Sequence, residues 1–268
     1  MNCIHKEMSS KIMISQHYFT FVFYLPRLCG QIKNWPSYLW NYLSRRRRPA
    51  EYKLRNGWRL IDGTGTLAGT IAVVFVRREY GRLSDLRTIV DIGANMGSFT
   101  IFAAMNNPKA TIYSFEPEKR NFDFLRQNVE INSLEKRVHT FPCAVSSSPG
   151  RRKMAIRASP LNTLVVENGE SALQTVDCVS LQSILHDHGL DTIDLLKMNC
   201  EGAEYEILEN CTSADFARLL NIRLEYHTLD SGKRNGDSLA KFLEKQGYRI
   251  QRFTRYQGVS GFIWATRV

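Results

Sequence analysis

The stretch that reads VDIGANMG, residues 90–97, carries the residue types that most directly indicate chemistry. An acid, Asp91, precedes two glycines, Gly93 and Gly97. Glycine lets the backbone turn sharply and come close to a ligand. The spacing G-x-x-x-G differs from the G-x-G-x-x-G of dinucleotide sites, so it favours a ligand without a pyrophosphate. Asp91 can then organise a cationic, amino-acid-like part of that ligand, directly or through water.

A second acid, Glu116, stands nineteen residues after Gly97 and is followed by Pro117. An acid at the end of a second strand accepts hydrogen bonds from the hydroxyls of a ribose. The alternative is a carboxylate that only favours the dipole of the next helix. Because the two motifs occur together at this spacing, we favour the ribose role.

The segment KMNCEGAE, residues 197–204, follows a predicted fourth strand. In open α/β sheets the ligand crevice lies outside the carboxyl ends of the strands, so this loop should face the reacting group. Glu201 and Glu204 are three residues apart at a helix start, where they can also act simply on the helix dipole.

His227, at the end of a predicted fifth strand, is the best candidate for a base, because imidazole can accept a hydroxyl proton near neutral pH. Glu225 lies two residues earlier on the same face and is a second candidate. A structural or exposed role for His227 is the alternative. His186 and His188 flank Asp187, and we interpret this cluster as a solvated helix end rather than a metal site.

The elements that must position these residues follow a strand–helix rhythm that begins at Thr88. Ser180 is a predicted N-cap, and Gly247 a predicted helix end. Residues 146–179 look less regular, with a turn at Pro149-Gly150. The alternation predicts an α/β fold with a mostly parallel seven-stranded sheet and helices on both faces. The predicted strands are TIVDI, TIYSF, VHTFPCAV, IDLLKM, NIRLEYH, YRIQRF and GFIWATR, of which the last is antiparallel.

The chain ahead of this core divides into two parts. Residues 1–50 form a predicted basic, aromatic helical extension, and residues 51–87 a cap with a β-hairpin at Asn56-Gly57, a strong turn signal. We therefore expect the ligand to be bound by residues 88–268, the core of a domain that spans 51–268. Residues 1–59 carry eleven Lys/Arg against two Asp/Glu, whereas the rest carries twenty-five against twenty-four. This near-neutral core argues against nucleic acid as a partner.

The apolar run at residues 12–28 is too short and interrupted to span a membrane, and it lacks a signal cleavage site. With the arginines at 45–48 it indicates a packed helical arm or a surface that leans on an anionic membrane. The six cysteines include no C-x-x-C pair, so we expect neither zinc nor a redox pair and favour a cytoplasmic setting, with peripheral membrane contact as an option.

Four segments resemble, in order and spacing, the FkbM family of methyltransferases: VDIGANMGSFT, FEPEKRNFDFLRQNV, IDLLKMNCEGAEYEIL and RLEYH. The resemblance runs from about Tyr52 to the C-terminus. It implies a class I methyltransferase Rossmann-like fold, S-adenosylmethionine as cofactor, and O-methylation of a hydroxyl on a sugar, glycan, polyketide or related small metabolite. The cofactor-binding residues that it implies are Asp91, Gly93, Asn95, Gly97, Glu116, Pro117 and Asn199. The candidate catalytic residues are Lys197, Asn199, Glu201 and His227, and Gly202 and Glu204 also match the family segment.

This chain departs from the family at Asn199, where the family usually has Asp. An amide cannot take a proton, so a general-base role is lost there. Asn199 then orients the substrate while proximity to an activated sulfonium drives the reaction, or else the enzyme is impaired. The intact cofactor motifs favour the first interpretation. The loss of one carboxylate also favours activity without a metal ion.

Other functions remain as alternatives. A methyltransferase acting on a protein or lipid is one, and a catalytically impaired module with the same fold is another. Methylation of a base amine is disfavoured because the loop that begins at Asn199 lacks an N/D-P-P-Y pattern. A nicotinamide dehydrogenase is disfavoured by the glycine spacing.

Overall fold

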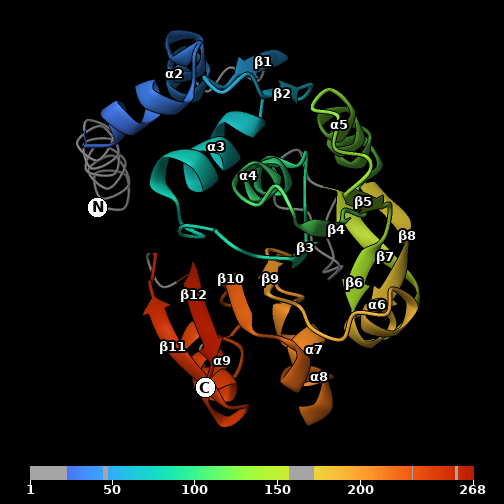
Figure 1. The fold of residues 1–268 in the computed structure, drawn as a ribbon. Helices are drawn as coiled ribbons and strands as arrows, with labels where there is room; N and C mark the ends of the chain where they lie inside the picture. The colour runs from blue at the N-terminus through green and yellow to red at the C-terminus, as the bar shows by residue number, and fades with distance from the viewer. Residues whose placement is uncertain (1–22, 45–47, 157–171, 231, 257–258) are drawn as a thin grey trace, which may run out of the picture. The chain divides into compact units, whose positions relative to one another are not determined.

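The computed structural model describes residues 23–44, 48–156, 172–230, 232–256 and 259–268 (Figure 1). The predictions that concern most of the apolar run at 12–28 and the arginines at 45–47 lie outside these residues. The chain divides into two compact units, residues 1–78 and 79–268, and each is described by itself.

The first unit contains the predicted hairpin. Strands β1 (Ala50–Lys53) and β2 (Arg59–Asp62) pair antiparallel around the Asn56-Gly57 turn, where Gly57 has a φ of 93°. Helix α2 (Trp35–Ser44) packs onto this hairpin through the buried Tyr38, whose ring meets the ring of Tyr52 edge-on at 5.5 Å. One aromatic pair thus joins the helix to the hairpin.

A buried aspartate starts the next helix of this unit. The Asp62 carboxylate accepts hydrogen bonds from the backbone N–H groups of Gly65 (2.6 Å) and Leu67 (3.0 Å), which closes the turn between β2 and α3 (Leu67–Ile71). The helix then widens into η1 (Ala72–Arg77), a π-helical segment. The apolar run at residues 70–76 is therefore helical.

The second unit is built on a seven-stranded sheet (Figure 1). Five neighbouring strands run parallel, and the last strand, β12, is antiparallel to both of its neighbours. This confirms the predicted sheet and its reversed final strand. In spatial order the strands are β11 (Tyr248–Phe253), β12 (Ser260–Arg267), β10 (Asn221–His227), β9 (Leu195–Met198), β3 (Thr88–Ile92), β4 (Thr111–Phe115) and β5 (Val138–Phe141).

Helices cover both faces of this sheet. Ser180 accepts a hydrogen bond from the N–H of Ser183 and caps α6 as predicted, and Gly247 follows α9 in a left-handed conformation. Helix α5 buries Phe122, Leu125 and Val129 on one face. The helices are α4 (Ser98–Asn106) and α5 (Lys119–Glu130) on one face, and α6 (Leu181–Asp187), α7 (Glu204–Glu209), α8 (Ser213–Arg218) and α9 (Gly236–Lys245) on the other.

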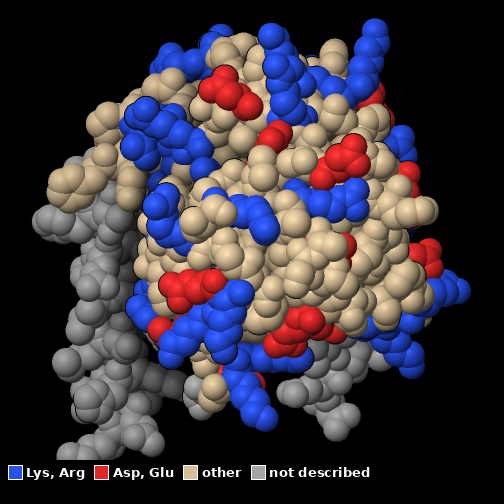
Figure 2. All heavy atoms as spheres, turned by 60° about the horizontal axis from the view of Figure 1, so that its bottom comes forward, with Lys and Arg blue, Asp and Glu red and all other residues tan. Residues whose placement is uncertain are grey.

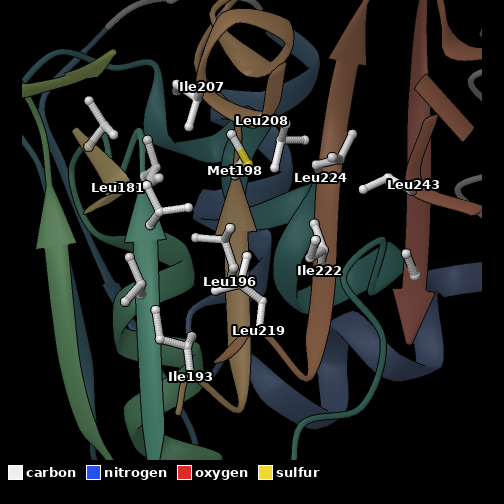
Figure 3. Packing of buried hydrophobic residues seen from close by; sticks show 14 of the residues in the cluster. Leu181, Ile193, Leu196, Met198, Ile207, Leu208, Leu219, Ile222, Leu224 and Leu243 are labelled. Atoms are coloured by element: carbon white, nitrogen blue, oxygen red, sulfur yellow. The ribbon is translucent and has the colours of Figure 1, made fainter. Parts of the chain in front are cut away.

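Alternation along the strands separates an apolar face from a charged one. Figure 3 shows Leu196 and Met198 of β9 beside Ile222 and Leu224 of β10, all directed toward the side of the sheet that carries α7. The residues between them point the opposite way, so Lys197 of β9 lies on the α4 side of the sheet. The packed core thus holds the strands whose carboxyl ends carry the candidate site.

A second sheet occupies the region that looked irregular in sequence. Strand β8 (Ala172–Ser180) pairs antiparallel with β7 (Gly150–Ile156) and parallel with β6 (Ala144–Ser146). The single strand predicted over VHTFPCAV is wrong, because it is divided into β5 and β6 around Pro142, which has no backbone N–H to donate. These strands pair with segments that are distant in the sequence, so no local sequence pattern predicts the pairing.

The described surface carries both signs of charge. On the face drawn in Figure 2, Lys and Arg side chains are interspersed with Asp and Glu, without a continuous basic field. Within the described parts of the chain, no helix has the length and apolar character needed to cross a bilayer.

Candidate active site

The loop after β3 forms a tight turn that meets the loop after β9. The backbone N–H groups of Gly93 and Ala94 both donate to the carbonyl of Phe115, each at 3.0 Å. Gly93 has a φ of 73°, and a Cβ added there would overlap the carbonyl oxygen of Asn199. Only glycine therefore allows the two loops to approach this closely.

Glu116 ties the end of β4 to the same turn. One carboxylate oxygen accepts from the N–H of Asn95 at 2.8 Å, and the other from the N–H of Glu118 at 3.0 Å. Asn95 itself is left-handed, with a φ of 52°. Burial raises the pKa of Glu116 to about 7, although these two backbone hydrogen bonds oppose the shift. Pro117, between Glu116 and Glu118, follows the end of the strand.

Asp91 and Lys197 form a buried ion pair beneath the turn. They are direct register partners on β3 and β9, with 2.8 Å between a carboxylate oxygen and Nζ, and their side chains are 0% and 4% exposed. Lys197 also donates to the carbonyls of Ile92 and Gly93, while Thr100 donates to Asp91 at 2.7 Å. The pair therefore fixes the backbone of the turn from below.

The loop after β9 is closed by Glu204. Its fully buried carboxylate accepts from the N–H of Cys200 at 2.9 Å and from the N–H of Gly202 at 2.8 Å. Within this loop Glu201 is left-handed, with a φ of 55°, a conformation uncommon for a residue with a side chain. A strained residue held by its surroundings is typical of functional sites.

His227 lies between two of these glutamates. Its Nε2 is 3.3 Å from Glu201, and its Nδ1 is 3.2 Å from Glu204. Burial lowers the pKa of His227, but the hydrogen bond and charge of Glu204 and the charges of Glu201 and Glu225 outweigh it and raise the pKa to about 9. Burial also raises the pKa of Glu201 to about 7, against the lowering effect of His227. At neutral pH the imidazole is therefore protonated.

Asn199 and Glu225 complete the cluster. The side-chain amide of Asn199 donates to Glu225 at 3.1 Å, whereas its carbonyl oxygen is buried and has no hydrogen-bond partner among the described residues. A buried acceptor without a partner is unfavourable unless a ligand supplies the donor. This orphaned oxygen indicates a ligand site where the two loops meet, at the close approach of Gly93 and Asn199.

The structure brings the predicted residues of the two loops together, with Glu116 tied to the same turn through Asn95. Gly97 lies at the start of α4 and Pro117 just after β4. The structure leaves His186 and Asp187 exposed and paired with each other, away from this cluster. Sequence reasoning undervalued Glu204, whose burial no local pattern reveals, and missed Tyr80. The ring of Tyr80 packs edge-on against Phe99, at 5.1 Å, and Phe262, and Lys197 lies 5.8 Å from its centroid.

No group of three or more His, Cys, Asp or Glu side chains in the described ranges is arranged to hold a metal ion. The cluster at His227 is instead connected by hydrogen bonds and ion pairs. A glycine turn after the first strand, an acid after the second and a reversed last strand define the class I methyltransferase fold.

Comparison with known proteins assigns the family. A family model described as the methyltransferase FkbM domain matches residues 91–250. The chain therefore belongs to the FkbM family and is an S-adenosylmethionine-dependent methyltransferase. The resemblance noted in the four sequence segments is thereby confirmed.

Three relatives cover part of the chain. The 31-O-demethyl-FK506 methyltransferase FkbM of Streptomyces tacrolimicus is 29% identical over 53% of this chain and 66% of its own length. Methyltransferase sdnD of Sordaria araneosa is 29% identical over 61% of this chain and 74% of its own. Hexuronic acid methyltransferase AglP of Haloferax volcanii is 26% identical over 59% and 61%. The matched region thus leaves a quarter or more of each relative without a counterpart.

Proposed function

We propose that this protein transfers the methyl group of S-adenosylmethionine to a hydroxyl of a small metabolite such as a sugar or polyketide. The names of FkbM, a 31-O-demethyl-FK506 methyltransferase, and AglP, a hexuronic acid methyltransferase, support this acceptor class. The observation that carries the proposal is His227 held between Glu201 and Glu204 beside the glycine turn. A histidine–carboxylate pair is suited to taking up a hydroxyl proton.

The residues present fit the cofactor. Glu116 is in place to accept from ribose hydroxyls, because each of its oxygens has capacity beyond the single backbone bond it accepts. The orphaned carbonyl of Asn199 offers an acceptor to the same ligand. When bound, S-adenosylmethionine supplies an electrophilic methyl on a positively charged sulfur. Gly93 and Gly97 let the turn after β3 pack against Asn199 and Leu125, which shapes the loop on which the cofactor would lie.

Asp91 and Lys197 act on the cofactor indirectly in this proposal. The Asp91 carboxylate is fully buried, and its oxygens face Lys197 and Thr100, so it does not reach a ligand directly. Lys197 directs its donors to Asp91 and to the carbonyls of Ile92 and Gly93. We therefore assign both residues to positioning the turn rather than to proton transfer.

Glu201 is the proton acceptor in this proposal, and His227 is its positioning residue. With a pKa of about 9, His227 already carries a proton at neutral pH and cannot accept another. Glu201, with a pKa of about 7, is largely ionised just above neutral pH and has the basicity that general-base catalysis favours. Glu204 holds the imidazole from the opposite nitrogen, as the third group of a catalytic triad does.

The charge of this cluster favours an uncharged acceptor. Glu201, Glu204 and Glu225 place three carboxylates near the cation of His227. An acidic sugar would bring a further negative charge into this buried setting, which is unfavourable. We therefore expect neutral hydroxyl compounds to be better acceptors than uronic acids of the same ring size.

The first experiment is calorimetric titration with S-adenosylhomocysteine of the wild type, Asp91→Ala and Glu116→Ala. Binding by the wild type that both variants weaken would support the site. A screen of labelled methyl transfer to paired neutral and acidic sugars, with and without Glu201→Gln, then tests the reaction. No binding by a folded wild type would overturn the proposal, as would undiminished transfer by Glu201→Gln.

The proposal also predicts turnover without an added metal ion. The carboxylates of the site are engaged by His227, by Asn199 and by backbone N–H groups, which leaves no ready oxygen cluster among these described side chains. Once an acceptor is found, its methylation should be equally fast with EDTA and with magnesium. Loss of turnover in EDTA that magnesium restores would contradict this.

A further inference from the structure

The outward face of helix α2 exposes apolar side chains, although their contact with water is unfavourable. Trp40 is 64% exposed and Leu43 is 40% exposed, and their spacing of three places them on one side of the helix. Tyr38, on another side, is fully buried and donates to the carbonyl of Ala68. The helix is therefore anchored to its own unit by one face and presents an aromatic and an aliphatic side chain on another.

The first unit carries the two most exposed aromatic side chains of the described residues. They are Phe23, which is 77% exposed, and Trp40. Single exposed apolar residues are common, but a large aromatic and a Leu on adjacent turns mark a contact surface. Tryptophan in particular is enriched where an apolar phase meets water.

The charge around this helix identifies the partner. Residues 1–59 carry eleven Lys/Arg against two Asp/Glu. Lys33 and Arg48, which flank α2 just outside its two ends, are both exposed. Basic residues alone could bind any polyanion. Basic residues around an exposed Trp and Leu instead favour a partner with anionic groups at its surface and an apolar layer below them. A bilayer with anionic lipids has that structure.

We propose that the outer face of α2, defined by Trp40 and Leu43 and flanked by Lys33 and Arg48, docks on anionic membrane. The helix would lie in the plane of the interface, with the two apolar side chains below the head groups and the two cations among the phosphates. With ten residues it is far too short to cross the bilayer. The proposal does not depend on the identity of the acceptor or on methyl transfer.

The test is sedimentation of the full chain with phosphatidylcholine vesicles, with and without phosphatidylserine, at low and at physiological salt. Wild type should bind the anionic vesicles at low salt and less at higher salt, because the electrostatic part is screened. The Trp40→Ser/Leu43→Ser variant should bind at least about tenfold more weakly. Lys33→Gln/Arg48→Gln should lose about as much, mainly at low salt.

A matched control removes exposed apolar side chains elsewhere. Leu220 and Val259 are 37% and 63% exposed and lie in the second unit. Leu220→Ser/Val259→Ser should bind vesicles like the wild type. Circular dichroism and S-adenosylhomocysteine affinity must be unchanged in each variant, so that misfolding is excluded.

Three results would overturn the proposal. One is no binding to anionic vesicles at low salt, and another is equal binding by Trp40→Ser/Leu43→Ser and wild type. The third is self-association without lipid that this double substitution abolishes, because that would assign the face to a second copy of the chain.

Discussion

At the scale of single residues, the site is dominated by how charges are distributed among Glu201, Glu204 and His227. The two glutamates contact opposite nitrogens of the imidazole, which turns a residue that sequence reasoning selects as a base into a cation at neutral pH. In the proposed mechanism the proton-accepting role belongs to Glu201, which the same reasoning includes without ranking it first.

This arrangement predicts a bell-shaped pH dependence of kcat/KM, limited by the pair as a whole. The rate should rise as Glu201 ionises near its pKa of about 7 and fall as His227 loses its proton near a pKa of about 9. Glu201→Gln should lose about 10²- to 10⁴-fold in rate.

His227→Gln is the diagnostic variant. The positive charge of His227 lowers the pKa of Glu201, so its removal should move the acidic limb to higher pH and abolish the alkaline limb. The profile is measured at saturating S-adenosylmethionine. An unchanged alkaline limb in His227→Gln would show that another group causes it.

Asn199 gives a second prediction, concerning stability. Its amide donates to Glu225 at 3.1 Å, so Asn199→Asp would set two carboxylates side by side, and one would keep its proton. A carboxyl whose folded-state pKa is raised makes the protein less stable as pH rises from its unfolded pKa toward the folded one. We expect Asn199→Asp to lose about 1–3 kcal/mol of unfolding free energy between acidic and mildly alkaline pH, relative to wild type.

Urea unfolding of Asn199→Asp and Asn199→Ala at both pH values measures this effect. Asn199→Ala removes the hydrogen bond without adding a charge, so its loss of stability should be nearly independent of pH. Parallel pH dependences in the two variants would exclude a proton shared between the introduced carboxylate and Glu225.

At the scale of elements, the close approach of two loops makes Gly93 irreplaceable. Gly93→Ala must push the turn after β3 away from Asn199, so we expect at least about a tenfold loss of S-adenosylhomocysteine affinity. Gly189 is a matched control, because it too is left-handed, at 58°, but a Cβ there meets nothing within 4 Å.

Gly189→Ala should therefore lose only about 1 kcal/mol of stability and keep its cofactor affinity. Calorimetric titration of both variants beside urea unfolding separates the two effects. Equal affinities for Gly93→Ala and wild type would show that the loops can part without affecting the ligand.

The elements also show what the sequence can predict. The strands of the main sheet and helices such as α5 follow hydrophobic periodicity, and their ends follow local signals such as Ser180 and Gly247, so most of them are predictable nearly residue by residue. The sheet formed by β6, β7 and β8 is not, because β7 pairs with a strand that lies beyond residues 157–171. Pairing between segments that are distant in the sequence produces no recognisable sequence pattern in either segment.

The same contrast holds for the site. Gly93 and Glu116 can be found in the sequence because their motifs are local and spaced in a regular way. The partners of His227 cannot, because β10 and the loop after β9 meet only in the folded chain. Side-chain pairing across strands, and the pKa values that result from it, require the three-dimensional structure.

At the scale of the whole molecule, a large apolar cluster packs against one face of the main sheet in the second unit (Figure 3). Leu224 is fully buried in this cluster, so Leu224→Ala should lower the unfolding free energy by about 2–5 kcal/mol. Leu220→Ala, at a side chain that is 37% exposed, should change it by less than about 0.5 kcal/mol. Thermal and urea unfolding measure both, and a small effect at Leu224 would mean that the core repacks.

The buried pair of Asp91 and Lys197 has a consequence for how the sheet assembles. The two residues are register partners, so sliding β9 by one position against β3 would turn the ammonium toward the apolar cluster without a counter-charge. Few mispaired arrangements of the central strands can therefore persist during folding. The two loops of the site are therefore aligned once the sheet has formed. Correct pairing of the strands during folding thus also sets the geometry of the cofactor site.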